Sequence, residues 1–563
     1  LATATSKGSI MPTFDEHITQ DMRDIYKTML PDVRVLQKNV NTSFDIPITA
    51  MMGNGITLSS ATIQSTNDEN FTDIQNYSLS CTIADNVITV TPTNVPEFKI
   101  GKEYRLRIPF SDNNDNGNTQ CADGTIYFNL VVVPDQVVWS PKTSSFNGWG
   151  LDENWKACDI NGTVLDGVPG YTPIAGSDVI IPTLDNVLLY PYITDHNHYP
   201  NVVHHHPSTC NNIYFAPGAK IHNQHLLQYE KAFVDMTIPE GNWYMMSAPL
   251  QKMYSGDMYV PHTGNWQTGS SLEIDDPFAT GAFQGTRSSS SAYAFWASYY
   301  NQSVKTWYDD GGSIESTSSS FQQSNGLNQP LEAGSGFALW GEGADVALGG
   351  NIVIRLPKQE ETYSTSSGNQ VSVPRDGKSH KLAFTASQDA EENITPMTIK
   401  LTNQKESEHF VFGNPTMAFI NMHDFLHANE EELNHTFYRL EGATWTAETE
   451  HTMTDNRYLA PMTSVMLETK DKDKKTELSV QLSPLHLTLT DLDDPFSEEN
   501  PEIKPVNLRA KVAEEDASEI MSIYAYTNDA YARTVLATTP VANDYYLIGE
   551  DALFVSSGIE SNS

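Results

Sequence analysis

The chain has 563 residues, and its 71 Asp and Glu residues against 33 Lys and Arg residues give a formal net charge of −38 at pH 7. This charge argues against nucleic acid and anionic membrane surfaces as partners, because both repel a protein without clustered basic residues. The chain is longer than a single hydrophobic core accommodates, so we expect several domains. No apolar run reaches the roughly 18 residues of a membrane-spanning helix. Because the sequence begins at Leu1, we expect a processed piece of a longer protein.

Most of the chain alternates with a period of two and is rich in Ser, Thr, Asn and Gly, which is typical of strands joined by turns. We therefore expect an all-β, multi-domain chain of immunoglobulin-like and other β-sandwich modules, with a small β-roll or solenoid-like segment and one or two short helices. One helix is expected at 13–30 within an N-terminal connector (1–30). There Ile18 and Met22 share a face, and Pro31 ends the pattern.

Residues 31–136 predict an immunoglobulin-like sandwich, because short alternating runs such as "EYRLRIPF" and "TIYFNLVVV" are separated by polar turns. The loop between these two runs, "DNNDNGNTQCADG", has oxygen-bearing side chains and a glycine at the spacing of a calcium loop. We expect an Asn/Asp/Gly hairpin loop without an ion, and therefore no cofactor, with a calcium site as the alternative. The candidate ligands are Asp112, Asn114, Asn116 and Asp123, with Gly117 at the turn.

Residues 137–239 predict a small β-roll or solenoid-like segment, because short strands are joined by Pro, Gly and Asn turns. The segment contains five histidines in "DHNHYPNVVHHHPSTC". In an extended chain His204 and His206 share a face about 6–7 Å apart, and a turn at Pro200 would bring His198 near them. A transition-metal site at these three histidines is one interpretation, and a solvated loop is the other.

Four cysteines occur, and none has the C-x-x-C spacing of a zinc knuckle or a redox motif. We expect two disulfides, Cys81 with Cys121 and Cys158 with Cys210, because each pair lies within one predicted domain. Such bonds would place the protein outside the cytoplasm. The alternative is four buried thiols in a reducing compartment.

Two later stretches share the same landmarks in the same order. In "NWYMMSAPLQ" and "EHFVFGNPTM" an aromatic strand leads into a small-residue turn closed by Pro, and a similar closing strand follows after a variable middle, "LEAGSGFALW" and "LAPMTSVMLE". This predicts two related β-sandwich modules, at 240–357 and 381–490, with chance similarity as the alternative. An acidic linker (491–505) and a further β-domain (506–563) are expected to follow.

A second helix is expected inside the later module, in "MHDFLHANEEELN" at 422–434. Its apolar positions are Phe425, Leu426 and Leu433, and its run of three glutamates from 430 to 432 would face solvent.

The region 292–312 holds seven aromatic residues beside acidic and amide side chains. Exposed aromatic rings stack on sugars while carboxylates and amides bond to hydroxyl groups, so this region is a candidate glycan contact. The alternative is ordinary sandwich core. The candidate residues are Trp296, Tyr299, Trp307 and Asp309.

The stretches "DVIIP", "YPYI", "CNNIYFAPGAKI", "LLQYEKAFVDM" and "NWYMMSAPLQKMYSGDMY" are similar to those of large modular, adhesin-like surface proteins of the Bacteroidales, within the Bacteroidota. The resemblance covers about Trp139 to Thr490. It implies an extracellular location on the bacterial cell surface and export by the type IX secretion pathway. It carries over no catalytic residues.

The sequence contains no H-E-x-x-H, G-x-S-x-G or P-loop motif. We therefore predict a non-enzymatic extracellular surface protein, serving as a structural, adhesive or assembly component such as a filament or surface layer. Its partners would be other surface proteins, copies of itself or glycans. The alternative function is a carbohydrate-binding or glycoside-hydrolase surface protein that acts through the aromatic region 292–312.

Overall fold

The structure is a computed structural model of the chain. It describes residues 32–489 with interruptions, which include 48–55, 113–123, 194–207, 279–293 and 310–329, and beyond residue 507 it describes strands alone. The described residues form many β-sheets and one α-helix, which confirms the all-β, multi-sheet prediction. None of the described helices is long and apolar enough to cross a membrane. The helix expected at 13–30 lies outside the described residues.

The chain divides into two compact units, and the segment 137–239 contributes to both of them. Unit 1 consists of residues 1–142, 151–180 and 198–211, and unit 2 consists of residues 143–150, 181–197 and 212–563.

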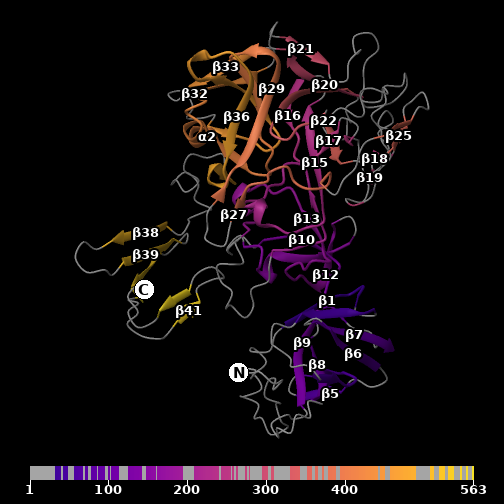
Figure 1. Ribbon diagram of the computed structural model, residues 1–563. Helices are drawn as coiled ribbons and strands as arrows, with labels where there is room; N and C mark the ends of the chain where they lie inside the picture. The colour runs from indigo at the N-terminus through magenta and orange to yellow at the C-terminus, as the bar shows by residue number, and fades with distance from the viewer. Residues whose placement is uncertain are drawn as a thin grey trace. The chain divides into compact units, whose positions relative to one another are not determined.

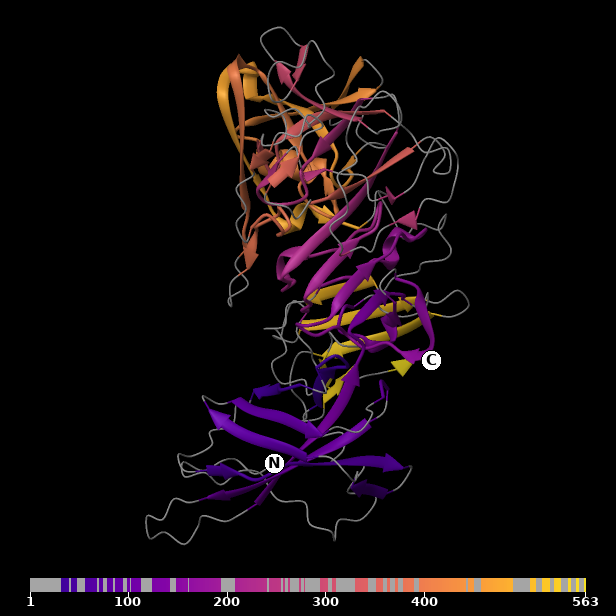
Figure 2. The same ribbon diagram turned by 90° about the vertical axis from the view of Figure 1, so that its right-hand side faces the viewer.

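Unit 1 begins with a sandwich whose two sheets enclose one core of alternating apolar residues, among them Ile46, Ile88, Leu106 and Leu130 (Figures 1 and 2). Alternation produces this core because successive side chains of a strand point to opposite faces. The first strand lies parallel to the last. One sheet has the order β1 (Asp32–Leu36), β9 (Gly124–Val133), β8 (Glu103–Asp112), β4 (Thr62–Asn67) and β5 (Asn70–Asp73), with β3 (Ile56–Leu58) also on β8, and the other has β2 (Phe44–Pro47), β7 (Val87–Asn94) and β6 (Ser78–Ala84).

The rest of unit 1 continues from the sandwich without a linker. Trp139 and Trp155 meet edge to face with ring centroids 5.0 Å apart. Arg34 of the sandwich forms an ion pair of 2.8 Å with Asp152. The tryptophan contact joins two of the short strands to each other, and the ion pair ties this region to the sandwich. The strands are β10 (Gln136–Trp139), β11 (Trp155–Cys158), β12 (Val164–Pro169) and β13 (Asp178–Ile181).

Unit 2 contains two segments of eight strands each, which we name segment A and segment B. Segment A consists of β15 (Lys231–Pro239), β16 (Trp243–Ser247), β17 (Met253–Tyr254), β20 (Ala294–Asn301), β21 (Thr306–Asp309), β22 (Pro330–Leu331), β23 (Gly336–Glu342) and β24 (Asn351–Leu356). Segment B consists of β29 (Met397–Ser407), β30 (His409–Gly413), β31 (Phe419–Asn421), β32 (Leu433–Glu441), β33 (Thr444–Thr449), β34 (Tyr458–Leu459), β35 (Ser464–Thr469) and β36 (Lys475–Leu482).

The two segments have the same strand pairings in the same order along the chain. The sheet β16-β23-β20-β21 of segment A corresponds to β30-β35-β32-β33 of segment B, and the pairs β17-β22 and β15-β24 correspond to β31-β34 and β29-β36. Every one of these pairings is antiparallel. Segment A therefore begins at β15, a strand earlier than the sequence landmarks indicate.

Segment B shows how the sequence makes its core. Apolar residues of β30 and β35 pack against those of β29 and β36, and the helix α2 (Met422–Ala428) adds its buried face to the same core. Figure 1 shows α2 beside β32 and β36. Phe412 and Phe425 stack with ring centroids 4.6 Å apart. The helix spans seven residues, shorter than the stretch 422–434 predicted for it, because Leu433 already begins β32.

Segments A and B touch each other at equivalent positions. Ser247 and Gly413 end the first strands of their sheets, and a Cβ added to Gly413 would lie closer than 3.0 Å to Ser247. Gly336 and Ser464 begin the closing strands, and a Cβ on Gly336 would lie 2.5 Å from that of Ser464. In each contact one segment supplies Gly and the other supplies Ser. The two backbones can approach closely because the glycine has no side chain.

The interface continues beyond these two contacts. Backbone hydrogen bonds of 2.9 Å run from the Gly413 N–H to the Gly334 carbonyl and from the Ser247 N–H to the Met462 carbonyl. A small apolar cluster of Met245, Ala338 and Val411 is buried beside them. Other strands of unit 2 are β14 (Asn212–Phe215), β18 (His262–Thr263), β19 (Glu273–Ile274), β25 (Thr362–Ser364), β26 (Gln370–Ser372), β27 (Ser387–Gln388), β28 (Ile394–Thr395), β37 (Leu487–Thr488), β38 (Asn507–Val512), β39 (Glu519–Tyr526), β40 (Tyr531–Ala537), β41 (Tyr545–Leu547), β42 (Leu553–Val555) and β43 (Ser561–Asn562).

The contact between Ser247 and Gly413 predicts the effect of an exchange. The substitution Gly413→Ser should lower the free energy of unfolding by about 1–3 kcal/mol, because the added atoms overpack the interface. Adding Ser247→Gly restores one Gly and one Ser at the contact, so the double variant should recover most of this loss. Chemical denaturation measures both, and a double variant no more stable than Gly413→Ser would contradict the contact.

Candidate functional site

A cluster of histidines lies on the outer side of α2, the helix of segment B. The helix begins after Asn421, whose side chain accepts a hydrogen bond of 3.5 Å from the Asp424 N–H. Its inner side buries Met422, Phe425 and Leu426. His423 and His427 are four residues apart and therefore share the other side, where both are partly exposed.

The third histidine, His435, comes from β32 and faces the helix. The ring centroids of His423 and His427 are 4.4 Å apart, and those of His427 and His435 are 4.2 Å apart. Glu430 lies in the turn between helix and strand, with its Oε2 4.0 Å from His435 Nε2. One ligand atom from each of His427, Glu430 and His435 lies within 4.8 Å of the others. Among the residues that the structure describes, this group has the donor types and spacing of a metal site.

The turn that carries Glu430 is held rigidly. The buried side chain of Asn429 donates to the Phe425 carbonyl at 2.8 Å and to the Gln481 carbonyl at 2.9 Å, and it accepts from the Gln481 N–H at 2.7 Å. Next to it, Glu432 forms an ion pair of 2.6 Å with Lys475. The helix, the turn and β32 are thus fixed to β36, which gives the cluster a firm base.

Asp424 orients the outermost histidine. His423 Nδ1 lies 3.1 Å from an Asp424 carboxylate oxygen, and the other oxygen accepts a hydrogen bond of 2.7 Å from the Asn421 amide. Arg457 donates to Asn421 at 2.9 Å and lies 3.8 Å from Asp424. Asp424 thereby links His423 to Asn421 and Arg457 beside the three candidate ligands.

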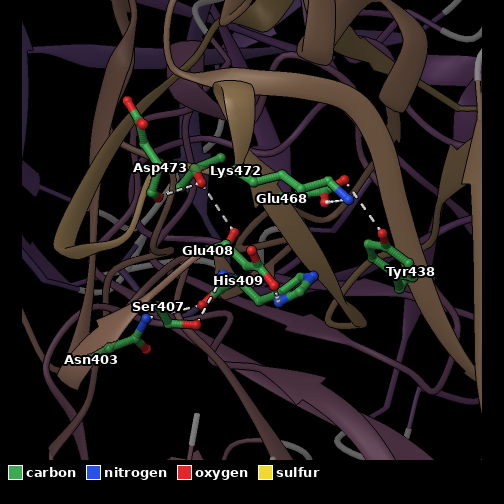
Figure 3. Close-up of polar contacts among 9 residues, drawn as sticks. Asn403, Ser407, Glu408, His409, Tyr438, Glu468, Lys472 and Asp473 are labelled. Atoms are coloured by element: carbon green, nitrogen blue, oxygen red, sulfur yellow. Dashed lines mark hydrogen bonds and ion pairs between the residues drawn. The ribbon is translucent and has the colours of Figure 1, made fainter. Parts of the chain in front are cut away.

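A second polar cluster lies where β29, β30, β32 and β35 come together (Figure 3). Tyr438 donates a hydrogen bond of 3.3 Å to Glu468, which also lies 3.5 Å from Lys472. Burial, and then the charge of Glu468, raise the pKa of Tyr438. His409 meets the Tyr438 ring edge to face at 5.5 Å, and its N–H donates to Ser407. These contacts join neighbouring strands, and we assign the cluster a structural role.

The metal sites expected from the sequence lie almost wholly outside the described residues. Asp112 is the last residue of β8, and the loop that would hold Asn114, Asn116 and Asp123 is not described. His198, His204 and His206 also lie outside the described residues. Both sites therefore stay predictions.

The candidate glycan residues fall on two adjacent strands of segment A, β20 and β21. The register places Trp307 opposite Tyr300, Asp309 opposite Ser298 and Tyr299 opposite Tyr308. Trp296 stands opposite Trp340, which in turn stands opposite Trp243. Three tryptophans thus occupy one row across three neighbouring strands, and the side chain of Trp243 is 40% exposed.

The predicted disulfide between Cys158 and Cys210 is not formed in the structure. Both residues are buried, and burial raises the pKa of the Cys158 thiol to about 12. The expectation rested on domain membership, which does not bring two sulfurs within bonding distance. Cys81 is a thiol as well, and its proposed partner Cys121 lies outside the described residues.

The histidine cluster was not predicted, although the sequence contains a signal for it. "HDFLHANEEELNH" has two histidines four residues apart on an expected helix, then Glu430 and His435. The i, i+4 spacing places the first pair on one helix face. The return of β32 alongside the helix depends on tertiary folding, and no local pattern indicates it.

The chain was compared with known proteins at three levels. No family model, no curated protein and no solved structure matches it.

Two other histidines of unit 2 are less accessible, His486 being buried and His222 partly buried. His222 stacks on Tyr192 with ring centroids 4.6 Å apart, and its Nε2 lies 3.2 Å from the Leu487 carbonyl. Burial lowers the pKa of His222, and that of His486 is lowered for the same reason. In both cases loss of solvation disfavours the protonated ring.

Burial of His222 predicts a pH dependence of stability. An unfolded histidine titrates at about 6.5, so below that pH the unfolded chain binds a proton that folded His222 resists. The neutral His222 ring therefore makes its full contribution to the free energy of unfolding above about pH 6.5. This contribution is lost as the pH falls from there through the lower pKa of the folded state. His222→Gln should therefore lose less stability than the parent between pH 7.5 and pH 5. Thermal melts check this, with the partly exposed His423→Gln as control; equal losses in parent and His222→Gln would contradict it.

Proposed function

We propose that this protein is a non-enzymatic, extracellular surface protein that acts as a structural, adhesive or assembly component. The observation that carries the proposal is the repetition in unit 2, where two segments with the same strand pairings pack through equivalent positions. Repeated β-segments that bury their sheet faces against each other form a rigid structure from one repeated architecture. Such a body suits a spacer or an assembly unit.

The way the two segments meet supports contacts with partners elsewhere. Each segment uses the same patch on the other, so the pair closes on itself and does not extend into an open stack through that patch. Contacts with copies of the protein or with other surface proteins would then use strand edges or loops. Within the described residues, β21 and β33 are end strands of the four-stranded sheets of segments A and B and offer such edges.

The location belongs to the same proposal. From the resemblance that the sequence of residues 139–490 suggests to adhesin-like proteins of the Bacteroidota, we also propose a place on the bacterial cell surface and export by the type IX pathway. The aromatic strand followed by Ser-Ala-Pro or Gly-Asn-Pro is part of that similarity, and these turns are the ones that join segments A and B.

Native cell-surface material offers the direct test. We expect electron microscopy with antibody labelling to find the protein in ordered or extended assemblies, and deletion of its gene to reduce adhesion. Edge-directed variants, with Lys introduced into β33 by Thr446→Lys, should weaken assembly while leaving the circular dichroism spectrum unchanged, because charged edge residues oppose strand addition. Dispersed monomers together with unchanged adhesion would overturn the proposal.

A carbohydrate-binding role is the second candidate, and the row of Trp243, Trp340 and Trp296 favours it. If this row binds glycans, Trp243→Ala and Trp296→Ala should each weaken binding to a responsive polysaccharide by about 1 kcal/mol or more, since aromatic stacking contributes on this scale. Trp307→Ala, at a candidate contact opposite Tyr300, tests whether glycan binding extends beyond this row. Glycan arrays and affinity electrophoresis measure the effect, and no affinity for any glycan would exclude this role.

A further inference from the structure

We propose that His427, Glu430 and His435 bind a divalent transition-metal ion, with Zn²⁺ as the best match, and that the ion links α2 to β32 in segment B. The proposal is independent of the surface role described above. It rests on the donor set, on the spacing of the donors and on the rigidity of the elements that carry them.

The donor set favours zinc over calcium or magnesium. Two imidazole nitrogens and one carboxylate oxygen are ligands that Zn²⁺ commonly takes, whereas Ca²⁺ and Mg²⁺ prefer oxygen ligands alone. Three protein ligands leave a fourth position of a tetrahedral ion for water or another donor. The bound site would carry a charge near +1, which the net charge of −38 favours.

The spacing needs little adjustment. Tetrahedral zinc with bonds of about 2.0–2.1 Å holds its ligand atoms about 3.3 Å apart. Here the three ligand atoms lie within 4.8 Å of one another, so modest side-chain rotations bring them to an ion. The rings of His427 and His435 are inclined at 56°, so they are not stacked face to face.

The setting also permits binding. The side chains of His435 and Glu430 are 30% and 63% exposed, so an ion can reach them from solvent. The bonds of Asn429 to Phe425 and Gln481 hold the backbone beneath them, which reduces the ordering that binding requires. His423, next to His427 and held by Asp424, stands at the rim of the site.

Zinc titration by isothermal calorimetry tests the proposal, using the untagged full chain after chelator treatment. The five histidines at 196–206 are competing donors, so the reference protein should carry His204→Ala and His206→Ala. In that background we expect one Zn²⁺ per chain. His427→Ala and His435→Ala should each weaken binding by at least about tenfold, since changes outside the ligand shell alone cost about 10–100-fold.

Matched variants separate a ligand from general electrostatics. Glu430→Gln should weaken zinc binding, while Glu431→Gln, the same change one residue further on, should leave it unaltered. Millimolar Ca²⁺ should not displace the zinc. The proposal is overturned if the reference protein binds no zinc, if His427→Ala and His435→Ala bind like the reference while their circular dichroism is native, if Glu431→Gln acts like Glu430→Gln, or if Ca²⁺ competes.

Discussion

The close approach of two sheets in unit 2 is the constraint on which the rest of that unit depends. At Ser247 against Gly413 and at Gly336 against Ser464, the backbones come so near that one partner of each contact cannot have a side chain. Each glycine gives up the conformational restriction that a Cβ supplies, a cost of roughly 0.5–1 kcal/mol in a strand. In return the hydrogen bonds to Gly334 and Met462 and the apolar cluster around Met245 can form. The position of each sheet is thereby set by the other.

A buried ion pair shows the same dependence on tertiary structure. Arg355 of β24 donates to Asp235 of β15 at 2.7 Å, and Tyr214 of β14 donates to the same carboxylate at 2.7 Å. Both charged side chains are buried, so neither could be lost alone without leaving an uncompensated charge in the interior. This network fixes the pairing of β15 with β24 as well as its register, because a shift of one residue would turn Arg355 away from Asp235.

Local sequence patterns are sufficient to predict the strands and turns, but they do not predict which of these elements come into contact in the folded chain. Alternation of apolar residues indicated the strands, and Pro after small residues marked the turns that end β16 and β30. The shared landmarks indicated two related stretches, yet β15 was missed as the first strand of segment A, because it precedes the landmarks. The approach of His435 to α2 depends on how β32 packs, and the separation of Cys158 from Cys210 depends on how β11 is paired. Neither follows from spacing along the chain.

The corresponding connections of the two segments differ greatly in length. Between its third and fourth strands, β31 and β32, segment B has residues 422–432, mostly α2, whereas segment A has residues 255–293 between the corresponding strands β17 and β20. The entropic cost of a longer connection grows only slowly with its length. This connection can therefore be lengthened by inserted residues without disturbing the Gly and Ser contacts between the two sheets. In segment B this connection forms a short helix that carries histidines, and in segment A the connection is longer. Segments A and B thus share one framework of strand pairings and differ in the connection that this framework carries.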